Sequence, residues 1–270
     1  MRPRLPSADS FSLTVGVVTA AVVVGALVVA PGVDVPVEEP LGALGVVVAI
    51  SVWTALEQIP ERVDATLRWR LHVASTGLLL LPILVAVGGR LTGLVSDVGP
   101  TATWAFVGLA LGGILVGVVG EFRRVRTLAD GVPIHAVVTA QQPRWQQLVY
   151  PLLGAVPTLA VMSYLLDGSV GVGSVVGFVL GTLAIVFFTG PETTELAAID
   201  SGLLVRSEGG KPRSLVPWRR IRTVETEGGR LRVVCGLPVP RTYLADLSSR
   251  DDAREVADAI RRCRRRGVSG

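Results

Sequence analysis

The sequence predicts a membrane α-helical bundle of about six transmembrane helices, followed by a small cytoplasmic α+β domain. Half of the 270 residues are hydrophobic, and before residue 191 they gather in long uncharged runs. A soluble domain of this length is less apolar on average. After residue 191 the long runs give way to short alternating segments and one amphipathic stretch. We therefore expect residues 1–191 to form the transmembrane domain and residues 192–270 the cytoplasmic domain.

The first predicted span is Phe11–Ala30, a run of 20 uncharged residues. This is the length that crosses a hydrocarbon core of about 30 Å. The alternative is a signal peptide, whose apolar region normally has about 7–15 residues and ends in a small-residue cleavage site. Pro31-Gly32 follows without such a site, which favours a retained helix. The other spans are expected at Leu41–Leu56, Leu71–Gly89, Thr103–Gly120, Leu148–Leu166 and Ser169–Pro191.

The distribution of basic residues between these spans predicts their orientation. The N-terminal arm has two basic residues, the 57–70 segment three, the 121–147 segment four and the tail sixteen, whereas the intervening loops have zero, one and zero. Lys and Arg concentrate on the cytoplasmic side of membrane proteins. We therefore expect a multi-pass protein of the cell membrane with both termini in the cytoplasm.

Glycine rows on two spans predict helix packing. The fourth span contains the pairs Gly108/Gly112 and Gly113/Gly117, and the sixth contains Gly173, Gly177 and Gly181. Small residues at this spacing let two membrane helices approach closely. Glycine is also frequent throughout the chain, so ordinary composition is the alternative explanation. The packing partner is either another span or a second copy of the chain in a homo-oligomer.

The tail reads as a series of short strands closed by one helix. Strands are expected at Thr194–Asp200, Leu203–Ser207, Ser214–Trp218, Arg220–Glu225, Arg230–Cys235 and Arg241–Ala245. Glu227-Gly228-Gly229 is a hairpin signal between two of them. Arg250–Arg266 is predicted to be a helix with an apolar stripe formed by Ala253, Val256, Ala257, Ile260 and Cys263. Ser249 with Asp252 resembles a capping box at its start.

Two segments of the tail resemble bacterial-type PH-like domains. They are Asp200-Ser201-Gly202-Leu203-Leu204-Val205 and Val216-Pro217-Trp218-Arg219-Arg220-Ile221-Arg222-Thr223-Val224. The resemblance covers about 75 residues and implies seven strands and a closing helix, of which the tail itself supplies five or six strands. The missing strand comes either from Val132–Thr139 in the 121–147 segment, which has a strand-like pattern, or from a partner subunit.

Composition also bears on the origin of the chain. Lys211 is its only lysine, so 25 of the 26 basic residues are arginine, and asparagine is absent. This bias is typical of GC-rich genomes, such as those of actinobacteria or haloarchaea. Together with the resemblance it predicts a prokaryotic multi-pass membrane protein.

No pattern predicts a catalytic residue, a bound metal or a cofactor. The two histidines, His72 and His135, lie on different segments, and Cys235 and Cys263 are isolated from each other and from histidine. His72 lies at a predicted span edge and is interpreted as an interfacial side chain. The span interiors hold no ionisable residue, which lowers the expectation of ion-coupled transport.

Basic residues of the tail form the candidate contact site. Residues 192–270 hold 16 basic and 11 acidic residues, a net charge of +5, whereas residues 1–191 hold 10 and 11, a net charge of −1. The candidate contact residues for anionic lipid headgroups or a protein partner are Lys211, Arg213, Arg219, Arg220 and Arg222. A solvated basic rim is the alternative. Nucleic acid is not expected, because few aromatic residues accompany these basic residues.

These observations predict a non-enzymatic membrane protein that acts through its PH-like domain in interaction, lipid sensing or scaffolding. The alternative function is a small transporter or channel with a cytoplasmic regulatory domain. An intramembrane enzyme is the third reading. The ligand, substrate, partner and oligomeric state are not encoded in any motif of the sequence.

Overall fold

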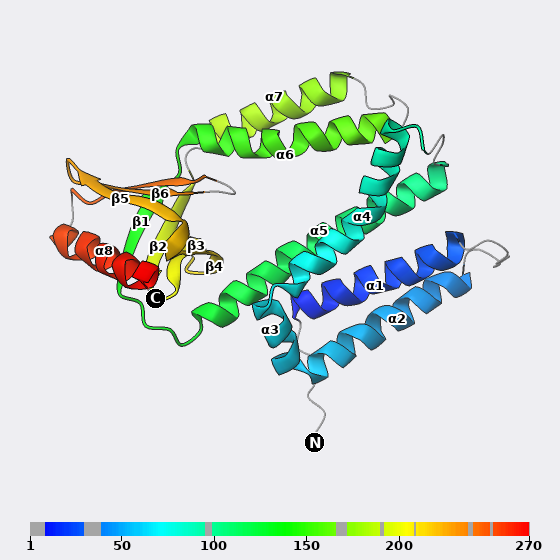
Figure 1. Ribbon diagram of the computed structural model, residues 1–270, viewed down its shortest axis with the longest axis horizontal. Coiled ribbons are helices and arrows are strands. Elements are labelled where there is room, and N and C mark those ends of the chain that lie inside the picture. Colours follow the sequence, from blue (N-terminus) through cyan, green and yellow to red (C-terminus); the bar gives the residue numbers. More distant parts are fainter. Residues whose placement is uncertain are drawn as a thin grey trace. The chain divides into compact units, whose positions relative to one another are not determined.

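The computed structural model describes residues 9–29, 39–94, 99–165, 172–189, 192–207, 209–236, 240–248 and 251–269. The chain forms two compact units: a helical unit of residues 1–124 with 165–167, and a sheet unit of residues 125–164 with 168–270. Figure 1 labels the elements of both. The opening residues of the chain, the loop after the first helix, Asp167-Gly168 and Ser249 lie outside the described residues.

The helical unit contains four long helices and one short one. The long helices are α1 (Ser10–Val29), α2 (Glu39–Gln58), α4 (Leu71–Leu91) and α5 (Pro100–Ala129), of which α5 continues past Arg124 into the sheet unit. Among the described residues these four helices are long and apolar enough to cross a membrane. They correspond to the first four predicted spans.

The predicted polar segment 57–70 contains a helix that the sequence analysis did not identify, α3 (Pro60–Arg68). Its first residue, Pro60, suits a helix start because proline has no N–H to satisfy there. Val63 and Leu67 are buried, with Leu67 only 1% exposed. Four positions separate these two residues, so they share one helix face that packs into the unit while the charged face remains outside.

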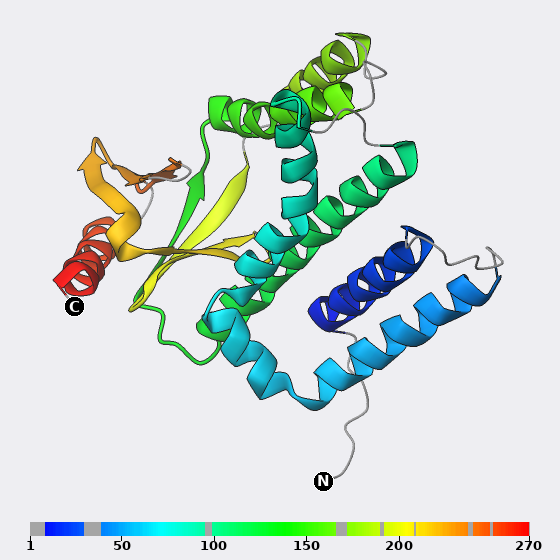
Figure 2. The same ribbon diagram turned by 45° about the vertical axis from the view of Figure 1, so that its right-hand side comes forward.

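The sheet unit is built on seven antiparallel strands in the order β4-β3-β2-β1-β7-β6-β5. The strands are β1 (Ala136–Gln141), β2 (Thr193–Ile199), β3 (Gly202–Ser207), β4 (Pro212–Pro217), β5 (Ile221–Glu227), β6 (Arg230–Cys235) and β7 (Thr242–Asp246). A single turn of 3₁₀-helix, η1 (Trp218–Arg220), separates β4 from β5. Figure 2 shows how strongly the strands twist from one end of the sheet to the other.

The central strand β1 comes from the 121–147 segment, as one of the two predicted alternatives proposed. Ala136 to Gln141 pair with Ala198 to Thr193 of β2, and Gln141 also pairs with Leu244 of β7. The strand begins four residues later than the predicted Val132–Thr139 and ends two residues later. It lies between β2 and β7 and so connects the strands β2–β4 to the strands β5–β7 in one sheet. The tail from residue 192 onward therefore holds six of the seven strands.

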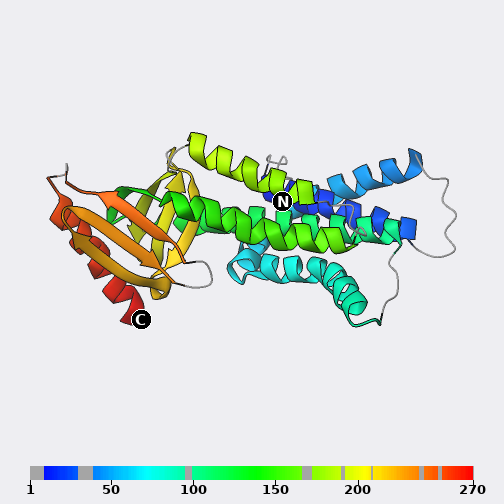
Figure 3. The same cartoon turned by 90° about the horizontal axis from the view of Figure 1, so that it is seen from above.

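Two helices are inserted between the paired strands β1 and β2. They are α6 (Arg144–Leu165) and α7 (Val172–Thr189), which occupy the predicted fifth and sixth spans. Figures 1 and 3 show them side by side. Because Gln141 and Thr193 are partners in the sheet, the start of α6 and the end of α7 lie at the same end of these strands. We call the pair the inserted hairpin.

The core of the sheet unit lies between the sheet and α8 (Ala253–Ser269). The predicted apolar stripe of this helix is confirmed, since Val256, Ala257, Ile260 and Cys263 are each at most 7% exposed. On the predicted strand Arg230–Cys235, which is β6, the alternate residues Leu231, Val233 and Cys235 are also buried. Figure 3 shows α8 along one face of the strands.

A second, smaller cluster covers the other face of β2 and β3. Val125 and Ala129 at the end of α5 pack with Ala197, Ile199 and Leu204. Burial on both faces explains why Leu196–Ile199 of β2 and Gly202–Val205 of β3 are continuous apolar runs rather than alternating ones.

Trp218 and Gly267 fix the position of the last helix. The indole N–H of Trp218 donates to the carbonyl oxygens of Ile199 and Asp200, both at 3.0 Å, and the side chain is 1% exposed. A Cβ at Gly267 would lie 2.2 Å from Cδ1 of Trp218. The end of α8 can therefore pass over the indole only without a side chain at this position.

Candidate functional site

A polar pocket of about 350 Å³ lies where the inserted hairpin leaves the sheet. We call it the basal pocket. Its residues come from the start of α6, the beginnings of β2 and β4, the end of β3 and the approach to β7. They are Gln142, Gln146, Gln147, Tyr150, Pro151, Glu192, Thr194, Val205, Arg213, Ser214 and Arg241.

The basal pocket carries an excess of positive charge. Arg213 and Arg241 supply two cations and Glu192 one anion, so its formal net charge is +1. Arg213 forms an ion pair with Glu192. The guanidinium carbon of Arg241 lies 6.0 Å from the centroid of the Tyr150 ring, at the outer limit of a cation–π contact.

Polar groups of α6 hold the wall of the pocket against the sheet. Oε1 of Gln146 accepts a hydrogen bond from the backbone N–H of Thr242 at 3.1 Å, and Gln146 is 1% exposed. The hydroxyl of Tyr150 is buried and has no hydrogen-bond partner among the described residues. A buried hydroxyl without a partner is costly, and a bound ligand or water would satisfy it.

Two weak acids near Arg241 have raised pKa values. Burial raises the pKa of the Cys235 thiol to about 11, and the charge of Arg241 opposes that rise. Burial likewise raises the pKa of Tyr243, again opposed mainly by Arg241. Both groups would be uncharged at neutral pH even with their ordinary pKa values of 9.0 and 10.0, so neither cancels the charge of Arg241.

Guanidinium, amide and hydroxyl donors on one wall suit a ligand with several anionic oxygens. Arginine recognises carboxylate and phosphate oxygens through paired N–H donors. The pocket contains no paired carboxylates and no histidine for acid–base chemistry.

The predicted basic contact residues lie at two ends of β4. Lys211 and Arg213 stand at its beginning, which pairs with the end of β3 beside the inserted hairpin. Arg219 and Arg220 follow its other end in η1, and Arg222 lies on β5. Only Arg213 of the five lines the basal pocket. Arg222 contributes its carbonyl oxygen to a hydrogen bond from Arg264 of α8, so this second group lies near the end of that helix.

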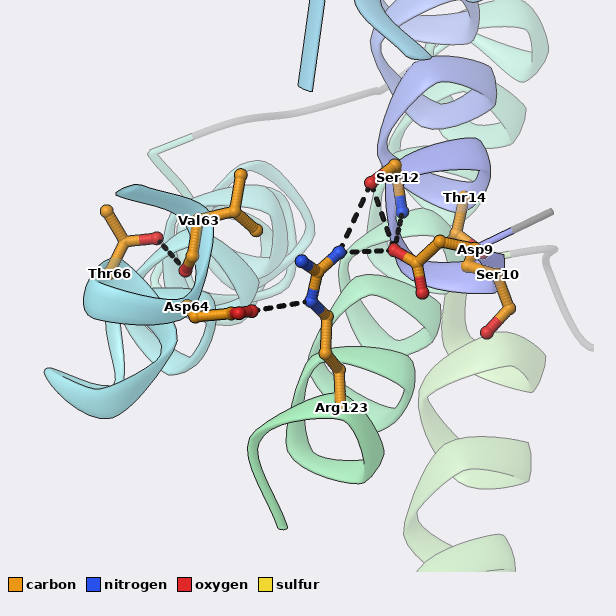
Figure 4. Close-up of polar contacts among 8 residues, drawn as sticks. All are labelled: Asp9, Ser10, Ser12, Thr14, Val63, Asp64, Thr66 and Arg123. Carbon is orange, nitrogen blue, oxygen red and sulfur yellow. Dashed lines mark hydrogen bonds and ion pairs between the residues drawn. The ribbon is translucent and has the colours of Figure 1, made fainter. Parts of the chain in front are cut away.

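In the helical unit, Arg123 joins three segments that the arginine distribution assigns to one side of the membrane. Its guanidinium forms ion pairs with Asp9 before α1 and, at 2.8 Å, with Asp64 of α3. It also lies over the ring of Phe11, 5.8 Å from the centroid. Figure 4 shows Arg123 between the two carboxylates. The N-terminal arm, α3 and the end of α5 are therefore held together.

His72 is more buried than the interfacial side chain that the sequence suggests. It is 4% exposed, and its Nε2 lies 3.1 Å from Oε2 of Glu121 on α5. It lines an apolar cavity of about 410 Å³ to which all five helices α1–α5 contribute. We call this the bundle cavity.

The glycines predicted for packing have different surroundings. A Cβ at Gly112 would lie 3.0 Å from Cγ1 of Val18 on α1, whereas one at Gly108 would meet no atom within 4 Å. The neighbouring pair Gly113 and Gly117 faces Leu79 and Thr76 of α4 at 2.8 and 2.6 Å. Gly173, Gly177 and Gly181 have no such neighbour among the described residues, and packing at this row stays a prediction.

Sequence reasoning missed Arg241, Gln146 and Tyr150, which come together only in the folded sheet unit. For Arg241 one signal was available in the sequence, because this charged residue stands at the start of the predicted strand Arg241–Ala245. It also missed the pairing of Arg123 with Asp9 and Asp64, although all three stand in segments predicted to share one side of the membrane.

Within the described part of the chain, no group of three or more His, Cys, Asp or Glu residues could hold a metal ion. A comparison with protein-family models and with curated proteins finds no match to this chain.

Proposed function

We propose that the protein is a membrane-anchored, non-enzymatic interaction module that binds anionic headgroups at the cytoplasmic surface. In this proposal six helices cross the membrane, both termini are cytoplasmic, and a PH-like domain lies against the bilayer. The helices α6 and α7 complete the six spans, on the evidence of their length and of a sequence without charged residues beyond Arg144 at the start of α6.

The observation that carries the proposal is the insertion of the hairpin between two adjacent strands. If α6 and α7 span the membrane, the paired strands β1 and β2 leave it at neighbouring points, since Gln141 and Thr193 are partners. Two short connections then hold this end of the sheet close to the headgroups. The basal pocket, with Arg213 and Arg241, is at that end.

The resemblance to PH-like domains is supported by the strand content. Seven antiparallel strands in two meanders, with one helix over the core, are what the resemblance implies. The placement of three predicted cytoplasmic segments on one common side is supported by Arg123, which joins them. Arg123 ties these segments to one another without indicating which side of the membrane they occupy.

The test measures anionic lipid retained by the full-length protein in nanodiscs that contain neutral and anionic lipids. Each basic group near a charged surface contributes about 1 kcal/mol, which corresponds to about a fivefold change in affinity. We expect Arg213→Gln and Arg241→Gln each to lower the retention of anionic lipid by about that factor. Arg254→Gln is the matched control, because Arg254 is an exposed arginine on α8. Equal retention by all three variants would contradict the proposal.

A second function, a small transporter or channel regulated by the sheet unit, is favoured by the pairing of the buried His72 with the partly exposed Glu121. Ionisable residues buried in a membrane bundle commonly mark a transport path. Flux of protons or of a solute in proteoliposomes, abolished by Glu121→Gln, would support this function over the first.

A further inference from the structure

The basal pocket contains one acid that the binding of a purely anionic headgroup does not use. Glu192 precedes β2, and its carboxylate pairs with the guanidinium of Arg213 on β4. The two side chains are 44% and 50% exposed, so water reaches both partners. A solvent-exposed ion pair contributes little to stability, because water and salt screen it. The carboxylate of Glu192 can therefore exchange this partner for a cationic group of a ligand.

Backbone hydrogen bonds fix the positions from which two of the charged side chains project. The carbonyl of Glu192 accepts a hydrogen bond from the N–H of Gln142 at 3.2 Å, which ties the residue before β2 to the residue after β1. The carbonyl of Arg241 accepts one from the N–H of Cys235 at 2.7 Å. The acid and this arginine are therefore held by the sheet itself.

The third charged residue, Arg213, stands at a β-bulge of the edge strand β4. Val205 of β3 pairs with Ser214, and the next residue, Arg206, pairs with Pro212, so Arg213 is the extra residue between them. Bulges redirect side chains and are frequent beside functional sites. The bulge thus sets the direction of Arg213, which lines the pocket beside Glu192.

The charged groups of the pocket are two cations and one anion. A ligand with anionic oxygens alone would pair with the arginines, but it would compete with Glu192 for Arg213 and be repelled by that carboxylate. A ligand that also carries an ammonium group gives Glu192 a cationic partner. An ammonium group supplies three donors and a carboxylate only accepts, so the two are complementary. The inverse of this pocket is a headgroup with two anionic groups and one ammonium group.

We propose that the basal pocket selects an amino-bearing anionic headgroup of the phosphoserine type. Arg213 and Arg241 bind its phosphate and carboxylate oxygens, and Glu192 accepts hydrogen bonds from its ammonium group. The inference rests on the proposed binding of headgroups by this pocket and adds the chemical class of the headgroup. Glycerol headgroups lack the ammonium group and ethanolamine headgroups lack the second anionic group, so both should bind more weakly.

The test uses the full-length protein in nanodiscs of choline lipid that contain equal amounts of two probes. One is phosphatidylserine, and the other is the same lipid with a hydroxypropionate headgroup, which keeps the phosphate and carboxylate and lacks the ammonium group. Lipid that copurifies with the protein is quantified by mass spectrometry. Nonspecific attraction to basic residues favours the hydroxypropionate lipid, because its net charge is more negative.

We expect phosphatidylserine to be retained about fivefold more than the hydroxypropionate lipid, the effect of one net hydrogen bond. Equal retention of the two probes, or preference for the more negative one, would overturn the proposal.

Substitution of Glu192 separates recognition of the ammonium group from binding of the anionic groups. Glu192→Gln keeps the size of the side chain and removes its charge, so the preference for phosphatidylserine should disappear while total retention stays the same or rises. The matched control is Glu225→Gln, because Glu225 is an exposed acid on β5 that does not line the pocket. The control should keep the preference. An unchanged preference in Glu192→Gln would show that another group binds the ammonium, and the proposal would be wrong.

The arginine variants distinguish failure of this inference from failure of headgroup binding. Arg213→Gln and Arg241→Gln should each lower the retention of both probes. If they do so while the unchanged protein shows no preference, headgroup binding stands and selection by Glu192 is wrong. If neither variant lowers retention, both proposals fail.

The free headgroup carries the same chemistry as the lipid, and one further measurement separates these two sources. Glycerophosphoserine is titrated calorimetrically into the protein in nanodiscs of choline lipid alone. Binding that Glu192→Gln abolishes would identify a soluble ligand of this class. Retention of phosphatidylserine without binding of glycerophosphoserine would identify the lipid. Either result supports the selection, and the absence of both overturns it.

Discussion

At the scale of single residues, burial makes two weak acids near Arg241 harder to ionise. It raises the pKa of both Cys235 and Tyr243, and the charge of Arg241 opposes the rise. The positive charge of the basal pocket itself comes from Arg213 and Arg241. Sequence alone shows the residue types and not their burial.

The raised pKa of Cys235 predicts a pH dependence of stability. The thiol has a pKa of about 11 in the folded protein against 9.0 for the unperturbed group. Between these values the unfolded chain loses its thiol proton and the folded chain keeps it. Stability is therefore full below pH 9 and falls as the pH rises toward 11. Tyr243, with its raised pKa, acts in the same direction.

The measurement is the midpoint of thermal unfolding of the detergent-solubilised protein against pH. We expect the thermal midpoint to fall less steeply with rising pH in Cys235→Ala than in the unchanged protein. The comparison uses the slope and not the midpoint at neutral pH. A Cys235 thiol that reacts with a maleimide in the folded protein as fast as in the unfolded protein would be inconsistent with its burial.

At the scale of elements, the contact between α4 and α5 depends on glycines without room for a side chain. A Cβ at Gly117 would lie 2.6 Å from Oγ1 of Thr76, the hydroxyl that donates to the carbonyls of His72 and Gly113. Gly108, four residues from Gly112 on the same helix, has open space around it. Gly117 and Gly108 both belong to pairs of glycines spaced by four on α5, but of these two only Gly117 has no room for a side chain.

This difference predicts opposite effects of the same substitution. Gly117→Ala should lower the thermal midpoint, because α4 must move or the Thr76 hydrogen bonds must break. Gly108→Ala should leave it unchanged or raise it slightly, since alanine favours the helix by about 1 kcal/mol over glycine. The two variants are compared by thermal unfolding in one detergent, and equal effects would contradict the structure.

The strand β1 allows a similar comparison between neighbouring residues. Val138 is 1% exposed in the core of the sheet unit, and Thr139 points to the opposite, exposed face. Val138→Asp would bury an unpaired charge, and we expect a loss of about 3 kcal/mol or more. Thr139→Asp should be nearly neutral.

Limited proteolysis of the two variants in membranes provides the measurement. Cleavage within residues 192–270 in Val138→Asp, with Thr139→Asp intact, is the expected result. Resistance of both variants would show that the tail folds without β1.

At the scale of the whole molecule, the sheet unit has a fold into which a helical hairpin is inserted. Gln141 and Thr193 are adjacent partners, so the strands β1 and β2 could be joined by a tight turn without disturbing their register. The pairing also means that a fragment that starts at residue 192 lacks the central strand. The predicted boundary at residue 191 marks the end of the long apolar helices. It leaves the central strand β1 outside the predicted cytoplasmic domain.

This arrangement predicts that the sheet unit can be separated from the hairpin. A chain of residues 130–141 joined through Asn-Gly to residues 193–269 should be soluble and fold cooperatively, because Asn-Gly forms two-residue hairpins readily. Residues 192–269 alone should remain unfolded or aggregate. Circular dichroism and amide hydrogen exchange compare them, and equal protection in both would contradict the role of β1.

The sequence determined the elements whose signal is local. Apolar runs located the first four long helices, alternation located β6 from Arg230 to Cys235, and the apolar stripe located α8. The adjacent glycines Gly228 and Gly229 made the turn between β5 and β6 recognisable in the sequence. In the structure both have positive φ. These features follow from helical and strand periodicity within a few residues, which any sequence displays directly.

Tertiary structure decided which distant segments meet. Arg123 finds Asp64 at a separation of 59 residues and Asp9 at 114, and β1 pairs with a strand that follows two helices later. The contact of His72 with Glu121 on another helix arises in the same way. Such contacts depend on the combined packing of several elements, and because no local periodicity records that packing, only the folded chain reveals them.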